Sequence, residues 1–159
     1  MSMETLTAEE RAERRAARRA ARKASKTEKE YTILYVDDEM PNLRGFKSTF
    51  RRLYNVHTAL GPQEALEVVK KEKIDLIVTD HRMPHMSGVE LLKDVFASHP
   101  HIKRMILSGF IKKADLYETI GDFGIHDFVT KPWDFENLNA IFQRILTTDA
   151  DVKDFSKLG

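Results

Sequence analysis

The segment that decides the fold runs from Ile74 to Pro84 and reads IDLIVTDHRMP. Its first half is a short aliphatic run, rich in β-branched residues and too short for an independent helix, which is typical of a buried central strand in a parallel sheet. Asp80 comes where this strand is expected to stop, because Pro84 cannot continue it. A new helical pattern opens at 86–88. We therefore expect a carboxylate at the C-terminal end of a buried strand, where open α/β sheets bind their ligands.

Strand-like and helix-like patterns alternate five times around this segment, across residues 31–147. Alternation of this kind predicts a parallel sheet with helices on both faces and right-handed crossovers. Helical periodicity also predicts that Phe46, Phe50, Phe96 and Phe142 belong to the core, and it extends the first helix to Leu53. The expected strands are 31–36, 54–58, 74–80, 102–107 and 124–130, and the expected helices are 40–53, 65–71, 88–98, 112–120 and 134–146.

The composition fits one globular domain with additional segments, because 42% of the 159 residues are hydrophobic. The chain has no cysteine, which excludes a disulfide framework and a thiolate metal site. No apolar run approaches the ~20 residues that span a bilayer, and the N-terminus lacks the apolar core of a signal peptide. We therefore expect a cytoplasmic protein without a membrane partner.

The N-terminal arm, residues 1–30, is rich in Ala and Arg and is predicted to be helical, with Thr7 and Glu10 as a capping box. One interpretation is a solvated helix that docks nowhere. The other is a basic surface for an acidic partner, such as nucleic acid or an acidic protein face. Membrane binding is disfavoured because the arm has no bulky apolar face. The arginines predicted to share one face are Arg11, Arg14, Arg15, Arg18 and Arg22.

The remaining segment, 148–159, is a polar tail with no clear pattern. The sequence thus predicts an arm (1–30), a domain (31–147) and a tail, and it has no recognisable output domain. Either the domain acts alone, or the arm or tail is the output, or the chain is part of something longer.

Polar residues follow four of the predicted strands: Asp37 and Asp38, then Asp80, Ser108 and Lys131. In a parallel sheet these ends meet on one rim. Crowded carboxylates repel one another, and a hard divalent cation such as Mg²⁺ removes that penalty through oxygen ligands. Phosphoryl transfer to a carboxylate needs an in-line nucleophile and positive charge on the phosphoryl oxygens. Asp80 can be the nucleophile, with Mg²⁺, Lys131 and the Ser108 hydroxyl holding the phosphoryl oxygens.

These motifs together resemble the receiver (CheY-like) domain of two-component response regulators. The resemblance covers 31–146 and rests on YVDDE (35–39), DHRMP (80–84) with Gly88, Ser108-Gly109, and FVTKP (128–132). Each motif alone is weak, but their order and their placement at strand ends are specific. The resemblance implies a flavodoxin-like doubly wound (βα)5 fold with strand order 2-1-3-4-5.

The resemblance also implies roles for single residues. Asp80 matches the phosphoacceptor, and Asp37 and Asp38 match the metal-binding pair, with Asp38 and Asp80 expected as direct Mg²⁺ ligands. The backbone carbonyl of Arg82 matches a third protein ligand. Lys131 matches the invariant lysine of the family, whose bond to the following proline is usually cis.

Four further residues match positions that concern switching and lifetime in this family. Ser108 matches the hydroxyl that moves towards the phosphoryl group, and Phe128 matches the aromatic residue that turns inward with it. Arg82 and Phe110 match positions that, in this family, flank the site and tune the lifetime of the aspartyl phosphate.

The resemblance implies a phosphoacceptor switch rather than a turnover enzyme. It implies that a sensor histidine kinase or histidine phosphotransfer protein phosphorylates Asp80, and that a downstream partner reads the face of the fourth helix, fifth strand and fifth helix, about Lys112 to Leu146. The alternative is a constitutive docking module that is not phosphorylated, with nucleic-acid or acidic-partner binding through the arm. A phosphohydrolase with an aspartyl nucleophile is rejected, because Arg82 stands where its general acid/base aspartate belongs.

Overall fold

The structure is a computed structural model that describes residues 6–27, 29–109, 112 and 123–148. The chain divides into two compact units, Met1–Glu30 and Tyr31–Gly159. The helix expected at 112–120 and nearly all of the expected tail lie outside the described residues. No helix in the described part of the chain is both long and apolar enough to cross a bilayer.

The second unit is built on a five-stranded sheet in which every pairing is parallel. The strand order is β2-β1-β3-β4-β5, which confirms the expected doubly wound topology. β3 pairs with both β1 and β4 at the centre, and all four of its residues are buried. Burial on both faces explains why this strand reads as a continuous apolar run. The strands are β1 (Thr32–Asp37), β2 (Asn55–Leu60), β3 (Leu76–Thr79), β4 (Lys103–Ser108) and β5 (Asp127–Thr130).

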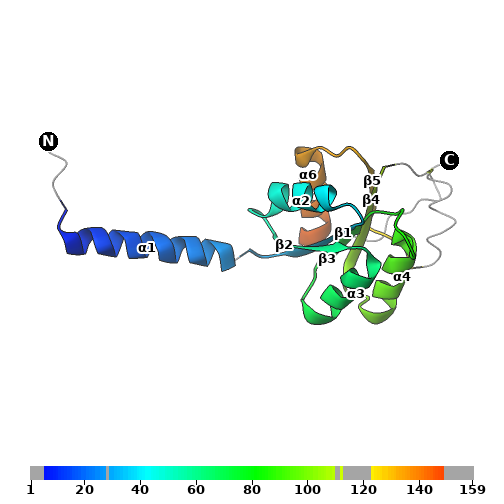
Figure 1. The fold of residues 1–159 in the computed structure, drawn as a ribbon, viewed down its shortest axis with the longest axis horizontal. Coiled ribbons are helices and arrows are strands. Elements are labelled where there is room, and N and C mark those ends of the chain that lie inside the picture. The colour runs from blue at the N-terminus through cyan, green and yellow to red at the C-terminus, as the bar shows by residue number, and fades with distance from the viewer. Residues whose placement is uncertain (1–5, 28, 110–111, 113–122, 149–159) are drawn as a thin grey trace. The chain divides into compact units, whose positions relative to one another are not determined.

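Helices cover both faces of this sheet (Figure 1). Successive β1 residues point to opposite faces, so Tyr35 joins the core beneath α2 and α6, whereas Leu34 and Val36 join the core beneath α3 and α4. This arrangement leaves the C-terminal strand ends free to carry polar groups. The helices of this unit are α2 (Met40–Phe50), α3 (Pro62–Lys71), α4 (Gly88–Ser98) and α6 (Phe135–Thr147).

One helix boundary and one core residue were predicted wrongly. The helix expected to reach Leu53 ends at Phe50, and Leu53 is 47% exposed because the buried Tyr54 takes the core position after the turn. Phe96 is 36% exposed, although it has helical spacing from buried residues. The guanidinium of Arg104 lies over its ring, 4.7 Å from the centroid, and this cation–π contact replaces part of the expected apolar burial.

The arm forms α1 (Ala8–Thr27), so its expected helix is present and continues into 25–27, which the sequence suggested as the start of a polar linker at 25–30. The backbone N–H of Thr7 donates to Glu10 Oε2, and the N–H of Glu10 donates to Thr7 Oγ1, both at 3.1 Å. These reciprocal bonds confirm the predicted capping box.

Candidate phosphoacceptor site

The polar rim of the sheet is assembled by the strand ladder itself. Asp37 is the last residue of β1, and Asp80 directly follows β3. The backbone N–H of Asp80 donates to the carbonyl of Val36 at 2.9 Å, so the hydrogen bonding between the two strands holds Asp80 beside Asp37. With Asp38 next along the chain, the three carboxylates each offer an oxygen within 4.8 Å of the others. The structure thus brings together the three predicted acids.

Asp37 is fully buried and its carboxylate receives four hydrogen bonds. Oδ2 accepts from Tyr35 Oη at 2.7 Å, Lys131 Nζ at 2.8 Å and Asn42 Nδ2 at 3.1 Å, and Oδ1 accepts from the Glu39 N–H at 3.0 Å. Burial by itself raises the pKa of this carboxyl group. The donors, led by Lys131 and Tyr35, outweigh burial and hold the pKa below its usual value. Asp37 is therefore a buried anion.

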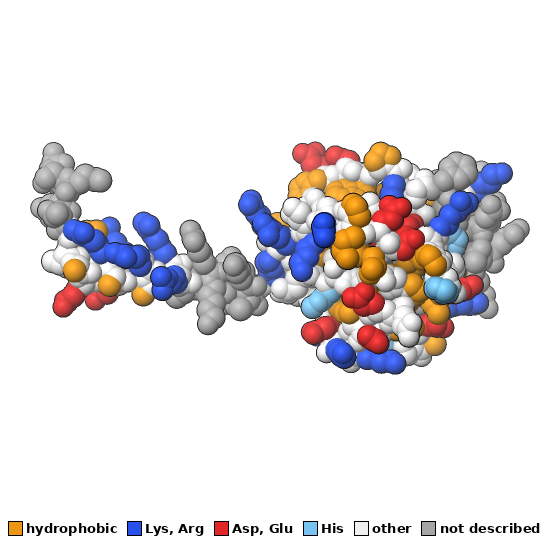
Figure 2. All heavy atoms as spheres, viewed as in Figure 1, with side chains coloured by type: hydrophobic (Ala, Val, Ile, Leu, Met, Phe, Trp, Pro, Cys, Tyr) orange, Lys and Arg blue, Asp and Glu red, His pale blue; other side chains and the backbone are white. Residues whose placement is uncertain are grey.

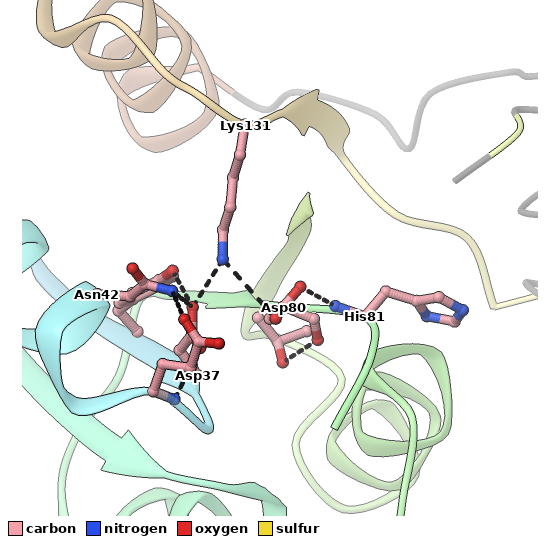
Figure 3. Close-up of polar contacts among 8 residues, drawn as sticks. Asp37, Asn42, Asp80, His81 and Lys131 are labelled. Atoms are coloured by element: carbon pink, nitrogen blue, oxygen red, sulfur yellow. Dashed lines mark hydrogen bonds and ion pairs between the residues drawn. The ribbon is translucent and has the colours of Figure 1, made fainter. Parts of the chain in front are cut away.

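Lys131 reaches into the acidic cluster from the residue after β5. Its backbone N–H donates to the carbonyl of Ser108 at 2.8 Å, and its bond to Pro132 is cis, as the resemblance implies. The side chain extends between two carboxylates (Figure 3), with Nζ 2.8 Å from Asp37 Oδ2 and 3.7 Å from Asp80 Oδ2. One cation therefore bridges the ends of β1 and β3.

Asp80 is held from its own loop as well. Its Oδ1 accepts a hydrogen bond from the His81 N–H at 2.8 Å, while the His81 ring points away from the cluster (Figure 3). The N–H of Gly88 donates to the His81 carbonyl at 2.7 Å. A Cβ added at Gly88 would lie 2.2 Å from the carbonyl oxygen of Asp80. The start of α4 therefore presses directly against the backbone of Asp80.

The site carries more negative charge than Lys131 neutralises. Asp38 is exposed, and partial desolvation together with the charges of Asp37 and Asp80 raises the pKa of its carboxyl group. An all-oxygen set with uncompensated negative charge, open to solvent on one side, is chemically suited to Mg²⁺ rather than to a soft metal. Asp38 and Asp80 are the carboxylates that would hold the ion, while Asp37 is already occupied by its four donors.

A family model described as the response regulator receiver domain matches residues 33–143. The chain belongs to this family. Receiver domains of this kind operate in two-component signal transduction.

Two relatives show the kinds of protein that carry similar receivers. The hydrogenase transcriptional regulatory protein HoxA of Cupriavidus necator is 32% identical over 107 residues, which are 67% of this chain and 22% of HoxA. The sensor kinase CckA of Brucella abortus is 32% identical over 120 residues, 72% of this chain and 12% of CckA. The chain thus spans less than a quarter of either relative. Among solved structures, chemotaxis protein CheY4 of Vibrio cholerae is 27% identical, with a TM-score of 0.68 over 73% of this chain and 98% of that chain.

The other predicted receiver residues are placed as follows. Ser108 is the last residue of β4 and is 2% exposed. Phe128 lies in β5, is half-buried and packs against the core beneath α3 and α4. Arg82 is exposed in the loop before α4, and Phe110 lies outside the described residues. The roles of all four residues in coordination, switching or lifetime stay predictions.

Three residues of the receiver site were not predicted: Tyr35, Asn42 and Gly88 in its structural role. Tyr35 and Asp37 are two apart on one strand, so the two-residue period already places both side chains on the same face. Asn42 lies three residues after Glu39, in the first turn of α2, and donates to its carboxylate as well as to Asp37. These signals exist in the sequence, whereas the contact of Gly88 with Asp80 depends on how the loop closes.

Proposed function

We propose that this receiver is a phosphoacceptor switch in which Asp80 takes a phosphoryl group from a sensor histidine kinase or a histidine phosphotransfer protein. The observation that carries the proposal is the position of Asp80, beside two carboxylates and 3.7 Å from the Lys131 ammonium. The proposal treats the chain as a switch that is itself modified, not as a turnover enzyme. The receiver domains present in a kinase and in a regulator support partners of both kinds.

The transfer forms a bond between an Asp80 carboxylate oxygen and phosphorus while the phosphorus–nitrogen bond to the donor histidine breaks. The displaced histidine nitrogen keeps the bonding electron pair, and the product is an acyl phosphate. Bound Mg²⁺ would supply positive charge to the phosphoryl oxygens. The chain itself orients Asp80 through the His81 N–H at 2.8 Å and provides a second cation in Lys131.

Switching follows from the position of Lys131. Its ammonium lies closer to Asp37 than to Asp80, at 2.8 Å against 3.7 Å. A phosphoryl group on Asp80 brings new anionic oxygens near the lysine, which favours a shift of Nζ away from Asp37. We propose that this shift, with Ser108 and Phe128, changes the downstream face at about Lys112 to Leu146, of which 113–122 lie outside the described residues.

The test is intact mass spectrometry of the chain after incubation with acetyl phosphate, with and without Mg²⁺. We expect the mass of one phosphoryl group to be added only when Mg²⁺ is present, and no addition to Asp80→Asn. The matched control is Asp94→Asn, which removes an exposed carboxylate from α4 and should label like the wild type. Continued labelling of Asp80→Asn would remove Asp80 as the acceptor.

The competing function is a constitutive docking module on the same fold. The fluorescence of Trp133 distinguishes the switch from the docking module, because this residue lines a pocket with Lys131. Its ring lies 5.5 Å from that of Phe50. Beryllium fluoride, which mimics a phosphoryl group, should change Trp133 fluorescence in a switch. Unchanged fluorescence together with no acetyl phosphate labelling would favour the docking module.

A further inference from the structure

The arm carries a concentration of positive charge that the receiver site does not use. Residues 14–26 contain seven Arg or Lys and no Asp or Glu, although the whole chain has a net charge of only +1. The described side chains of α1, up to Arg19, are all exposed (Figure 2 shows the arginines among them). The like charges in such a stretch repel one another, and binding to an anionic partner relieves this repulsion.

Composition narrows the nature of this partner. The only apolar residue in Ala8–Thr27 is alanine, so the helix cannot bury enough apolar surface to dock in a protein groove or a lipid surface. Five of the seven bases in 14–26 are arginine, whose planar guanidinium matches phosphate oxygens in pairs. The binding free energy must therefore come from charge, and the arginine chemistry favours phosphates.

The spacing of the bases follows the helix. Basic pairs recur every four residues at 14–15, 18–19 and 22–23. Each step advances the pair by ~6 Å along α1, which is about 30 Å long in total. A helix with alanine between its basic pairs is slim, and the ~12 Å major groove of B-DNA admits a helix, whereas the deep, narrow groove of duplex RNA does not.

The arm lacks the residue types that other modes of nucleic-acid binding require. Residues 1–30 contain no Phe, Tyr or Trp, so no aromatic platform exists for stacking the bases of a single strand. They also contain no Asn or Gln, the side chains that read adenine. The arm is thus expected to contact mainly the sugar–phosphate backbone of the nucleic acid, with little preference for base sequence.

We propose that the basic half of α1, residues 14–26, binds the phosphate backbone of duplex DNA. The capping box at Thr7 and the acids Glu9 and Glu10 stabilise the N-terminal turn, while the basic segment contacts phosphates. The receiver is then tethered to DNA through its arm. This interaction is independent of Asp80 and stands whether or not the receiver is phosphorylated.

The test is fluorescence anisotropy of a labelled 30-base-pair duplex of mixed sequence, titrated with the full chain at several salt concentrations. With about four bases on phosphates, raising salt from about 50 to 200 mM should weaken binding about 100-fold. Arg18→Ala/Arg19→Ala should weaken binding at least tenfold and reduce the slope of log K against log salt by about 2. Alanine is the best helix former, so this variant keeps α1.

The matched control is Lys70→Ala/Lys71→Ala, which removes two exposed charges from the last turn of α3. We expect its affinity to stay within about twofold of the wild type. Competition with unlabelled duplex DNA, single-stranded oligothymidine, duplex RNA and polyglutamate, matched for total charge, identifies the partner. The proposal is overturned if the duplex is not bound, if both double variants weaken binding equally, or if any other polyanion displaces the duplex as well as DNA does.

Discussion

Gly88 has no room for a side chain, because a Cβ there would lie 2.2 Å from the Asp80 carbonyl oxygen and 2.9 Å from the His81 Cα. Both obstacles are backbone atoms, so the loop must move to accept any substitution. Gly88→Ala should lower the free energy of unfolding by about 3 kcal/mol, measured by urea denaturation. It should also slow phosphorylation of Asp80, since the displaced atoms belong to that residue.

Gly45 supplies the control. It lies inside α2, and nothing is within 4 Å of a Cβ added there. Gly45→Ala should raise the free energy of unfolding by about 0.5–1 kcal/mol through helix propensity. Equal effects of the two substitutions would show that backbone crowding at Gly88 does not limit the site.

His126 makes the stability of the receiver depend on pH. It is 8% exposed, and its Nδ1 accepts from the backbone N–H of Arg104 at 3.1 Å. Burial, followed by the positive charge of Arg104, lowers the pKa of His126 to about 4. In the unfolded chain this histidine has an ordinary pKa of about 6.5. Between the two pKa values it is therefore protonated in the unfolded chain and neutral in the folded chain. Stability is therefore fully present above the unfolded pKa and is lost as pH falls from about 6.5 towards 4.

Between pH 7 and pH 5 this linkage should cost about 2 kcal/mol of unfolding free energy. His126→Asn keeps an acceptor for the Arg104 N–H but cannot take up a proton. Urea denaturation of this variant at the two pH values should show a correspondingly smaller loss. An identical loss in variant and wild type would assign the pH dependence to other groups.

Prediction from sequence succeeded for residues whose chemistry depends on strand ends, and failed for a buried charge that is satisfied by backbone carbonyls. Asp37, Asp80 and Lys131 were expected on one rim, because parallel strands end on the same side, and they lie within contact distance there. The buried Arg104 was not expected. Its guanidinium donates to the backbone carbonyls of Ile102 and Gly124. No sequence pattern predicts hydrogen bonds between a side chain and distant backbone carbonyls.

Among the elements, α4 begins at a capping box that fixes the approach of the helix to Asp80. Ser87 Oγ accepts from the Glu90 N–H at 3.2 Å, and the Ser87 N–H donates to the Glu90 carboxylate at 3.4 Å. Ser87→Ala should lower the free energy of unfolding by about 1 kcal/mol in urea denaturation. Ser98→Ala, at the other end of α4, removes a hydroxyl that donates to the carbonyls of Asp94 and Val95 and lies 2.8 Å from Nδ1 of His99, but it caps no helix N-terminus. It should change stability by less than about 0.5 kcal/mol, and an equal effect would contradict the capping argument.

Element boundaries were predictable where a local signal marks them. The expected helix 88–98 matches α4 (Gly88–Ser98), because Ser87 caps one end and Pro100 follows the other. The expected strand 124–130 is longer than β5 (Asp127–Thr130). Gly124 has a φ of 72°, and Ile125 is buried without belonging to the strand. Ile125 is apolar and buried, as strand residues are, so hydrophobicity alone does not separate a strand from a buried turn.

For the whole molecule, the topology was predictable because alternating strands and helices leave few allowed arrangements. The order β2-β1-β3-β4-β5 puts β1, β3, β4 and β5 side by side, so four of the five strands contribute a polar residue to one rim. The site is therefore a consequence of topology, with residues from positions 37 to 131 of the chain. The role of the arm was left open by the sequence, because a solvated helix and a basic binding surface have the same composition.

Deleting residues 1–30 tests whether the arm and receiver are independent units, as the sequence predicts. The two units separate at Glu30, and the described α1 side chains up to Arg19 are exposed. Removal of an exposed helix with only alanine as its apolar residue should change the unfolding free energy of the receiver by less than about 0.5 kcal/mol.

Trp133 is the only tryptophan in the chain, and its ring lies near those of Phe46 and Phe50 in the receiver core. Its fluorescence in urea therefore follows the receiver alone, and acetyl phosphate labelling of Asp80 provides a second measurement on the same shortened chain. We expect the unfolding midpoint, the urea dependence and the labelling to match those of the full chain. If the unfolding free energy of the shortened chain were lower by more than about 1 kcal/mol, the arm would instead be part of the receiver fold. Because such a loss requires buried contacts, the basic residues would then be held against the domain and less available to DNA.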